Sequence, residues 1–276
     1  MKALPVGLQL YSIRDMLEEQ PENFKPVMEQ LRNFGYDGVE LAGTYGLSPE
    51  FIRDALGEIG LNPISAHIPL TLMMEDSKKA ANECATIGCQ YVVIPYLPEE
   101  FRHNTPGYER ALAEFSRIRH VMQDHGLKLL YHNHDFEFVA MPDGSTGFDD
   151  IYKRVPDVLE AEPDTCWIKV AGFNPAALIS QYKKRCPIIH LKDFIKEGAP
   201  KNMYKLIGLD SNSQCESDGL FEFRAVGFGQ QIWLPILEAS VQAEAKWAVV
   251  EQDEHYSIPS IECARRSREH LKILGW

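Results

Sequence analysis

The chain has 276 residues, of which 45% are hydrophobic and 25% charged, so it can bury a full core and suits one large domain or two small ones. Lys and Arg total 28 against 40 for Asp and Glu, which gives a formal net charge of −12. This charge repels phosphate backbones and anionic lipid, and it argues against nucleic acid and membrane surfaces as partners.

The N-terminus and the cysteines indicate the compartment. Residues 1–20 contain a short apolar run that is broken by Pro5 and Gly7 and followed by acidic residues, a pattern of neither a signal peptide nor a membrane span. The six cysteines are scattered and include no CxxC pair, so we expect reduced thiols and no disulfides. A cytoplasmic location is the resulting expectation.

Short apolar runs rich in β-forming residues recur along the chain. They cover residues 6–13, 38–43, 63–69, 91–97, 127–134, 158–165, 187–194 and 246–253. Segments of helical period lie between or after them, at residues 22–35, 48–60, 77–88, 108–126, 147–155, 175–185, 234–245 and 259–275. Ser48 before Pro49 is typical of a helix start, and glycines such as Gly35, Gly60 and Gly88 stand just past a last helical turn.

Strands that are apolar on both faces and alternate with helices predict a parallel sheet covered by helices. Eight such units match a (β/α)8 TIM barrel better than an open doubly wound sheet, which usually has a Gly-rich phosphate turn after its first strand. No linker divides the chain, so we expect one domain over residues 1–276. The irregular segment 195–231 after the seventh strand is long enough to predict a functional loop or lid over the substrate.

Nearly every predicted strand ends in polar side chains, at the edge where a barrel of this kind forms its active site. These residues are Tyr11 and Arg14, Glu40, His67, Tyr96, then His132, His134 and Glu137, then Glu162 and Asp164, then His190, Lys192 and Asp193, and finally Glu251 and Asp253. Any one of them alone is more often a surface or structural residue, but their joint occurrence favours a site. Oxygen and nitrogen ligands without a thiolate suit a divalent ion such as Mn²⁺, Mg²⁺, Co²⁺ or Zn²⁺.

The sequence resembles the xylose isomerase-like TIM barrels over nearly its whole length. The resemblance is carried by VGLQLYSIR, FGYDGVEL, ISAH, YHNHDFEF, DTCW, IIHLKDF, VGFG and VVEQD. That family includes sugar isomerases and epimerases, inosose dehydratases and the type IV apurinic endonucleases. The resemblance implies a metal ion whose ligands match Asp164, His190 and Glu251. The fifth strand departs from the pattern, because His132 stands where many relatives have a Glu, so the fourth ligand is Glu137 or, as the alternative, His132.

The candidate catalytic residues follow from their chemistry. Imidazoles titrate near neutrality, so His132 and His134 suit the roles of acid, base or substrate contact. The ammonium of Lys192 suits a substrate oxygen that becomes negative. The carboxylates of Glu137 and Glu251 are candidates both for holding the metal and for taking part in catalysis.

Three further residues, together with Lys192, are candidates for binding the substrate. Glu40 and His67 would lie across the barrel mouth and could bind hydroxyl groups, or they could form a structural network there. Trp167 could offer an apolar face to a sugar ring, or it could belong to the core.

The sequence therefore predicts a divalent-metal-dependent sugar isomerase or epimerase that acts on a keto sugar or related polyol through an enediolate. A dehydratase or lyase that uses the same metal site is the alternative, because an enediolate can also expel a leaving group. The net charge of −12 argues against an apurinic endonuclease, and the matching ligands argue against a non-catalytic barrel. The expected partner is a small sugar or polyol, and association into homo-oligomers is left open.

Overall fold

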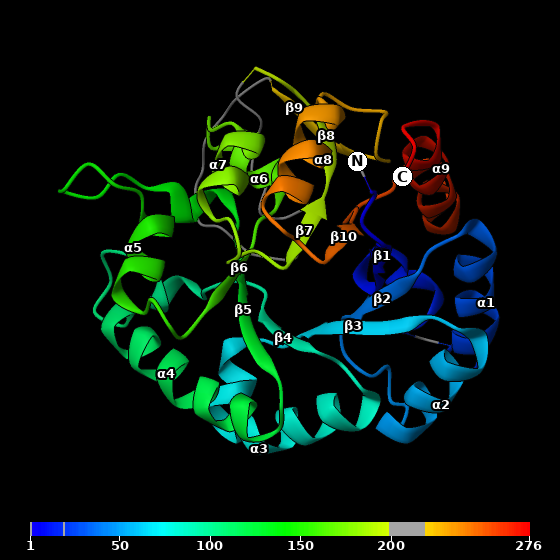
Figure 1. Ribbon diagram of the computed structural model, residues 1–276, viewed down its shortest axis with the longest axis horizontal. Helices are drawn as coiled ribbons and strands as arrows, with labels where there is room; N and C mark the ends of the chain where they lie inside the picture. Colours follow the sequence, from blue (N-terminus) through cyan, green and yellow to red (C-terminus); the bar gives the residue numbers. More distant parts are fainter. Residues whose placement is uncertain (1, 19, 199–218) are drawn as a thin grey trace.

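The predicted (β/α)8 barrel is confirmed. The computed structural model describes residues 2–18, 20–198 and 219–276, in which eight parallel strands form a nearly closed barrel surrounded by helices (Figure 1). The barrel strands are β1 (Val6–Gln9), β2 (Gly38–Leu41), β3 (Asn62–His67), β4 (Tyr91–Ile94), β5 (Lys128–His132), β6 (Glu160–Glu162), β7 (Ile188–Leu191) and β10 (Trp247–Val250). Their order is β6-β5-β4-β3-β2-β1-β10-β7, and the last gap, between β6 and β7, is spanned by a bridge between Asp164 and His190.

The helices lie outside the barrel (Figure 1). They are α1 (Phe24–Phe34), α2 (Pro49–Ile59), α3 (Leu70–Ile87), α4 (Tyr108–Asp124), α5 (Gly147–Arg154), α6 (Thr165–Val170), α7 (Pro175–Gln181), α8 (Trp233–Gln242) and α9 (Ser260–Ile273). The expected limits of α2 are confirmed, because Ser48 accepts a hydrogen bond from the backbone N–H of Phe51 and Gly60 ends the helix in a left-handed conformation.

The barrel interior contains an apolar layer and, next to it, the candidate site. Ile64, Tyr91, Val93, Leu130, Ile188 and Val249 form the buried apolar cluster. Successive side chains of a strand point to opposite faces, so the residues two positions after Leu130, Ile188 and Val249 also face the interior. These residues are polar and stand at the carboxyl ends of β5, β7 and β10: His132, His190 and Glu251. The strand period therefore brings them together.

Two predicted strands end earlier in the structure than the sequence suggests. The run 6–13 is a strand only as far as Gln9 and continues as the 3₁₀ helix η1 (Leu10–Met16). The run 158–165 contains the short strand β6 and then the start of α6, because Asp164 accepts two backbone hydrogen bonds and so begins a helix. The remaining 3₁₀ helices are η2 (Pro21–Asn23), η3 (Glu99–Phe101) and η4 (Asp135–Phe138).

The predicted loop or lid at 195–231 is described only at its ends. There β8 (Asp193–Glu197) and β9 (Leu220–Arg224) pair in an antiparallel ribbon, and residues 199–218 lie outside the described part of the chain. Within the described residues, no helix has the length and apolar character needed to cross a membrane.

Candidate active site and metal centre

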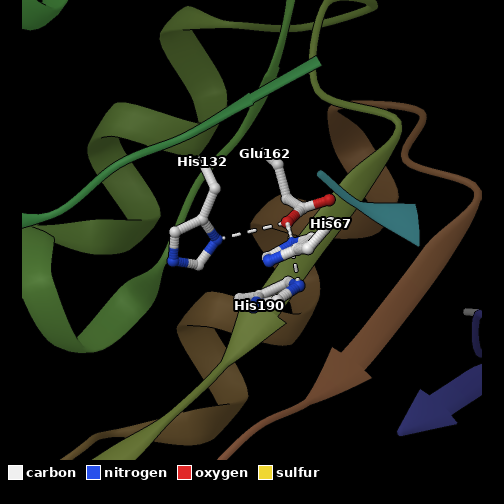
Figure 2. A group of neighbouring side chains, drawn as sticks. All are labelled: His67, His132, Glu162 and His190. Atoms are coloured by element: carbon white, nitrogen blue, oxygen red, sulfur yellow. Dashed lines mark hydrogen bonds and ion pairs between the residues drawn. The ribbon is translucent and has the colours of Figure 1, made fainter. Parts of the chain in front are cut away.

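Two overlapping groups of metal-ligating side chains lie at the carboxyl ends of the strands. The His67 group consists of His67, His132, Glu162 and His190 (Figure 2), and the Asp164 group consists of His132, Asp164, His190 and Glu251. In each group, one ligand atom from every member lies within 4.8 Å of the others. His132 and His190 belong to both groups.

The histidines of the His67 group are held by hydrogen bonds to the carboxylates of Glu162 and the neighbouring Glu40. Nε2 of His67 lies 2.7 Å from Oε1 of Glu162 and 3.0 Å from Oε1 of Glu40. Nε2 of His190 lies 2.6 Å and 3.0 Å from the same Glu40 and Glu162 oxygens. Gln9 and Ser65 also donate hydrogen bonds to the Glu40 carboxylate. Burial alone would lower the pKa of His67, but the carboxylates of Glu40 and Glu162 outweigh it and raise the pKa to about 10.

The Asp164 group contains a buried carboxylate oxygen that accepts no hydrogen bond from the described residues. Oδ1 of Asp164 accepts hydrogen bonds from the backbone N–H groups of Cys166 and Trp167, at 2.7 and 3.0 Å, which fixes the carboxylate at the start of α6. Oδ2 has no hydrogen-bond partner among the described residues. It lies 3.6 Å from Nε2 of His132 and 3.5 Å from Nζ of Lys192. A buried carboxylate oxygen without a partner is costly, and a bound cation would satisfy it.

Each shared histidine turns one nitrogen to each group. His132 has Nδ1 3.2 Å from Glu162 and Nε2 facing Asp164. His190 has Nε2 beside Glu40 and Nδ1 3.0 Å from Glu251. Histidines that bind a metal through one nitrogen usually donate the other N–H to a carboxylate, which fixes the ring. The Asp164 group therefore fits a metal centre, and Glu40 and Glu162 fit the carboxylates that orient its histidines.

The charges of the site also fit a cation. Five buried carboxylates, Glu40, Glu162, Asp164, Glu251 and Asp253, lie within this network. Burial raises the pKa of Asp164 to about 6 and that of Asp253 to about 7, against the opposing effect of the Lys192 ammonium and with a contribution from the Glu251 carboxylate. A divalent ion would lower both pKa values, because it favours the ionised form of each carboxylate.

Lys192 is the buried cation beside the Asp164 group. Its Nζ lies 2.7 Å from Oδ2 of Asp253 and 2.9 Å from Oε2 of Glu251. Burial would lower its pKa, but Asp253, Glu251 and Asp164 together raise the pKa well above the ordinary value. The ammonium therefore stays charged, as the predicted role of Lys192 requires.

His134 is a buried imidazole outside both groups. It stacks on Phe136 at 5.2 Å, and its Nδ1 has no hydrogen-bond partner among the described residues. Burial, followed by the charge of Lys192, lowers the pKa of His134 well below the ordinary value. The ring is therefore neutral, and its Nδ1 lone pair or N–H is unused by the described residues.

The structure places Glu137 outside both groups of metal-ligating side chains. Oε2 of Glu137 accepts a hydrogen bond from the backbone N–H of His134 at 2.7 Å, and Oε1 accepts one from the Tyr131 hydroxyl. The carboxylate thus caps η4, and it belongs to neither group of ligands found in the described residues. His132, the alternative, belongs to both. Burial also raises the pKa of Glu137 to about 8, so the group is mainly neutral at pH 7.

Two of the expected substrate contacts are placed elsewhere. Trp167 is fully buried and packs with Phe221 and Phe223, not on a cavity wall, because α6 turns its ring into that aromatic cluster. Glu40 is also fully buried, in the structural network that the sequence left open as its alternative role. His67 and Lys192 do reach the cavity.

A cavity of about 840 Å³ opens onto the site. The site residues on its wall are His67, His132, His134, Lys192, Glu251 and Asp253. Cavities of roughly 300–1,000 Å³ are typical of small-molecule sites. The metal-ligating groups, a charged lysine and a neutral imidazole therefore border one space that can hold a substrate.

Comparison with known proteins decides the family. The family model described as "Xylose isomerase-like TIM barrel" matches residues 28–274. The chain belongs to this family. It is 22% identical to an inosose dehydratase of Geobacillus kaustophilus over 60% of this chain and 61% of that one. It is 21% identical to an inosose dehydratase of Clostridium beijerinckii over 97% of this chain and 94% of that one.

Solved structures share the fold. A sugar phosphate isomerase/epimerase from Parabacteroides distasonis superimposes with a TM-score of 0.75 and 19% identity, over 99% of this chain and 94% of that one. The IolI protein, solved with a bound zinc atom, superimposes with a TM-score of 0.68 and 16% identity over 98% of both chains. The family and the barrel are thus shown, and the inosose dehydratases and the sugar phosphate isomerase/epimerase among these relatives are enzymes that act on small sugar-like molecules.

Proposed function

We propose that this protein is a divalent-metal-dependent isomerase or epimerase that moves a proton next to the carbonyl of a keto sugar or related polyol. The observation that carries the proposal is the Asp164 group, which collects two imidazoles and two carboxylates beside a cavity that also contains Lys192 and His134. A metal-ligating set, a fixed positive charge and a neutral base are the groups that this reaction needs.

His132, Asp164, His190 and Glu251 would hold the ion. Their ligand atoms are nitrogen and oxygen, which suits Mn²⁺, Mg²⁺, Co²⁺ or Zn²⁺, and the zinc in the structure of IolI supports such a site. When bound, the ion would supply a Lewis acid that draws electron density from a carbonyl and makes the neighbouring C–H more acidic.

The side chains around the ligands would move the proton and stabilise the charge. His134 is neutral and borders the cavity, so it can take a proton from the substrate carbon and return it at another position. Lys192 can donate a hydrogen bond to the substrate oxygen on which negative charge develops. Glu137 contributes through His134, because its carboxyl group accepts the backbone N–H of that residue and fixes the turn after β5.

Dehydration is the second candidate. The curated relatives named above are inosose dehydratases, and one of them matches over 97% of this chain. Removal of the same proton followed by loss of a neighbouring hydroxyl group would give dehydration at the same site. An apurinic endonuclease is a poorer fit, because the chain carries a net charge of −12.

Solvent exchange tests the proposal. The metal-loaded protein would be incubated in D₂O with a panel of keto sugars and inososes, and deuterium uptake and loss of water would be followed by NMR and mass spectrometry. An isomerase or epimerase incorporates deuterium without losing water, whereas a dehydratase loses water. His190→Ala should lose the metal and the exchange together. Full metal content in this variant, or no reaction with any compound, would contradict the proposal.

A further inference from the structure

The cavity extends well beyond the metal-ligating groups. From the strand ends it continues past residues 41–44 after β2 and then along α3. Its wall on that side includes Leu72, which precedes a kink of α3 at Asp76, and then Lys79, Glu83 and Ile87, whose spacing of four residues places them on one side of the helix after the kink. At 1.5 Å per residue, the helix from Lys79 to Ile87 alone covers roughly 12 Å. A single sugar ring held at the Asp164 group would occupy only one end of this length.

The outer part of the cavity has a largely apolar wall. The apolar side chains that line it include Leu41, Ile68, Pro69, Leu72 and Ile87. Leu72 keeps 53% of its surface exposed although it stands at this wall. Single exposed leucines are ordinary, but an exposed one that borders a cavity continuous with a candidate active site is available to an apolar group of a ligand.

The charges along α3 disfavour an anionic ligand. Among the described residues of this wall, Glu75, Asp76 and Glu83 carry negative charge and Lys79 carries positive charge. Lys79 already lies 4.0 Å from Glu83. The other cavity lysine, Lys192, is bound to carboxylates at the opposite end. A phosphate group attached to the substrate would therefore meet repulsion and no free cation in this part of the cavity.

We propose that the outer cavity along α3 is a second subsite, which takes an uncharged, apolar group attached to the sugar ring, such as the aryl group of a glycoside. The substrate is then a substituted keto sugar, not a free or phosphorylated one. The inference rests on the proposed function only in that the metal end of the cavity holds the ring. The subsite itself depends on the wall of α3.

Three probes test the subsite by binding alone. Phenyl β-D-glucoside, methyl β-D-glucoside and glucose 6-phosphate would be titrated into the protein, with Mn²⁺ and after its removal, by calorimetry or ligand-observed NMR. Burial of roughly 60 Å² of the phenyl ring corresponds to about ten-fold tighter binding than that of the methyl glucoside. Glucose 6-phosphate should bind no more tightly than the methyl glucoside. This tighter binding of the phenyl glucoside relative to the methyl glucoside, the phenyl advantage, should persist without metal.

Leu72→Asp should abolish the phenyl advantage, and Leu234→Asp should retain it. Leu234 is a matched control, because it is also 53% exposed and lies on α8, away from the cavity. Equal binding of the two glucosides, a phenyl advantage that survives in Leu72→Asp, or preferential binding of the phosphate would each overturn the subsite. Failure of the proposed function would show separately, as absent solvent exchange while the phenyl advantage is present.

Discussion

The identity of the fourth metal ligand can be tested with two substitutions in one short stretch. His132→Ala removes an imidazole that belongs to the Asp164 group, and Glu137→Gln changes a carboxyl group that caps η4. We expect His132→Ala to lose Mn²⁺ binding and Glu137→Gln to retain it. The two residues are five positions apart, so the pair separates two interpretations of the same motif.

The expected magnitudes follow from the contacts. Loss of a carboxylate that only orients a ligand typically costs about 10- to 100-fold in metal affinity, so loss of a ligand itself should cost more than about 100-fold. Glu137 has a pKa of about 8 and is mainly neutral at pH 7. Glutamine is also neutral, so the substitution leaves the charge at position 137 unchanged. The glutamine amide can still accept a hydrogen bond from the backbone N–H of His134 and donate one to the Tyr131 hydroxyl. Mn²⁺ affinity in Glu137→Gln should stay within about three-fold.

Isothermal titration with Mn²⁺ at pH 7 measures both variants, and circular dichroism checks that each is folded. His120→Ala, which removes an exposed histidine of α4, is the matched control and should bind Mn²⁺ as the unaltered chain does. Metal lost from Glu137→Gln but retained by His132→Ala would refute our assignment and restore Glu137 as the ligand. Metal retained by both would mean that the fifth strand contributes no ligand.

Four other outcomes are expected. Glu162→Gln should weaken Mn²⁺ binding about 10- to 100-fold in calorimetry, because the carboxylate orients His132. His134→Ala should keep its metal and lose turnover by roughly 10²- to 10⁴-fold in a solvent-exchange assay. Without metal, the stabilisation from His67 is fully present below pH 6.5 and is lost as the pH rises to about 10, so urea unfolding should show a decrease of about 5 kcal/mol that His67→Gln lacks. Asp193→Ala should cost roughly 3 kcal/mol in the same assay, because five donors lose their acceptor.

The fold was predictable because strand and helix periods alternate so regularly, and part of the site followed from the same regularity. His132, His190 and Glu251 each stand two residues after an apolar residue that faces the barrel interior. The apolar layer and the candidate ligands are therefore successive inward-facing positions of the same strands. Sequence alone can reveal this pattern once the strands are located.

Glu137 and Trp167, which lie away from the candidate ligands or the cavity, stand where the chain leaves that strand pattern. Glu137 follows the end of β5 by five residues, after the backbone has entered η4, so strand alternation no longer says where its side chain points. The spacing of His134 and Glu137, with a carboxylate three residues after the residue that precedes the helix, is that of a capping box and could have indicated the structural role. Trp167 occupies the core position that the sequence left open as its alternative, because Asp164 starts a helix where a strand was expected.

In the proposed metal centre, a histidine at position 132 in place of a glutamate would not leave the ion short of negative charge. A neutral imidazole in place of a carboxylate removes one negative charge from the ligands. The carboxylate of Glu162 lies 3.2 Å from Nδ1 of His132, on the side away from Asp164, and it accepts that N–H. An imidazole that donates to a carboxylate is a stronger ligand, because part of the carboxylate charge is transmitted through the ring. In the proposed metal centre, His132 of the stretch YHNHDFEF and Glu162 of β6 would together supply what a single glutamate would supply directly.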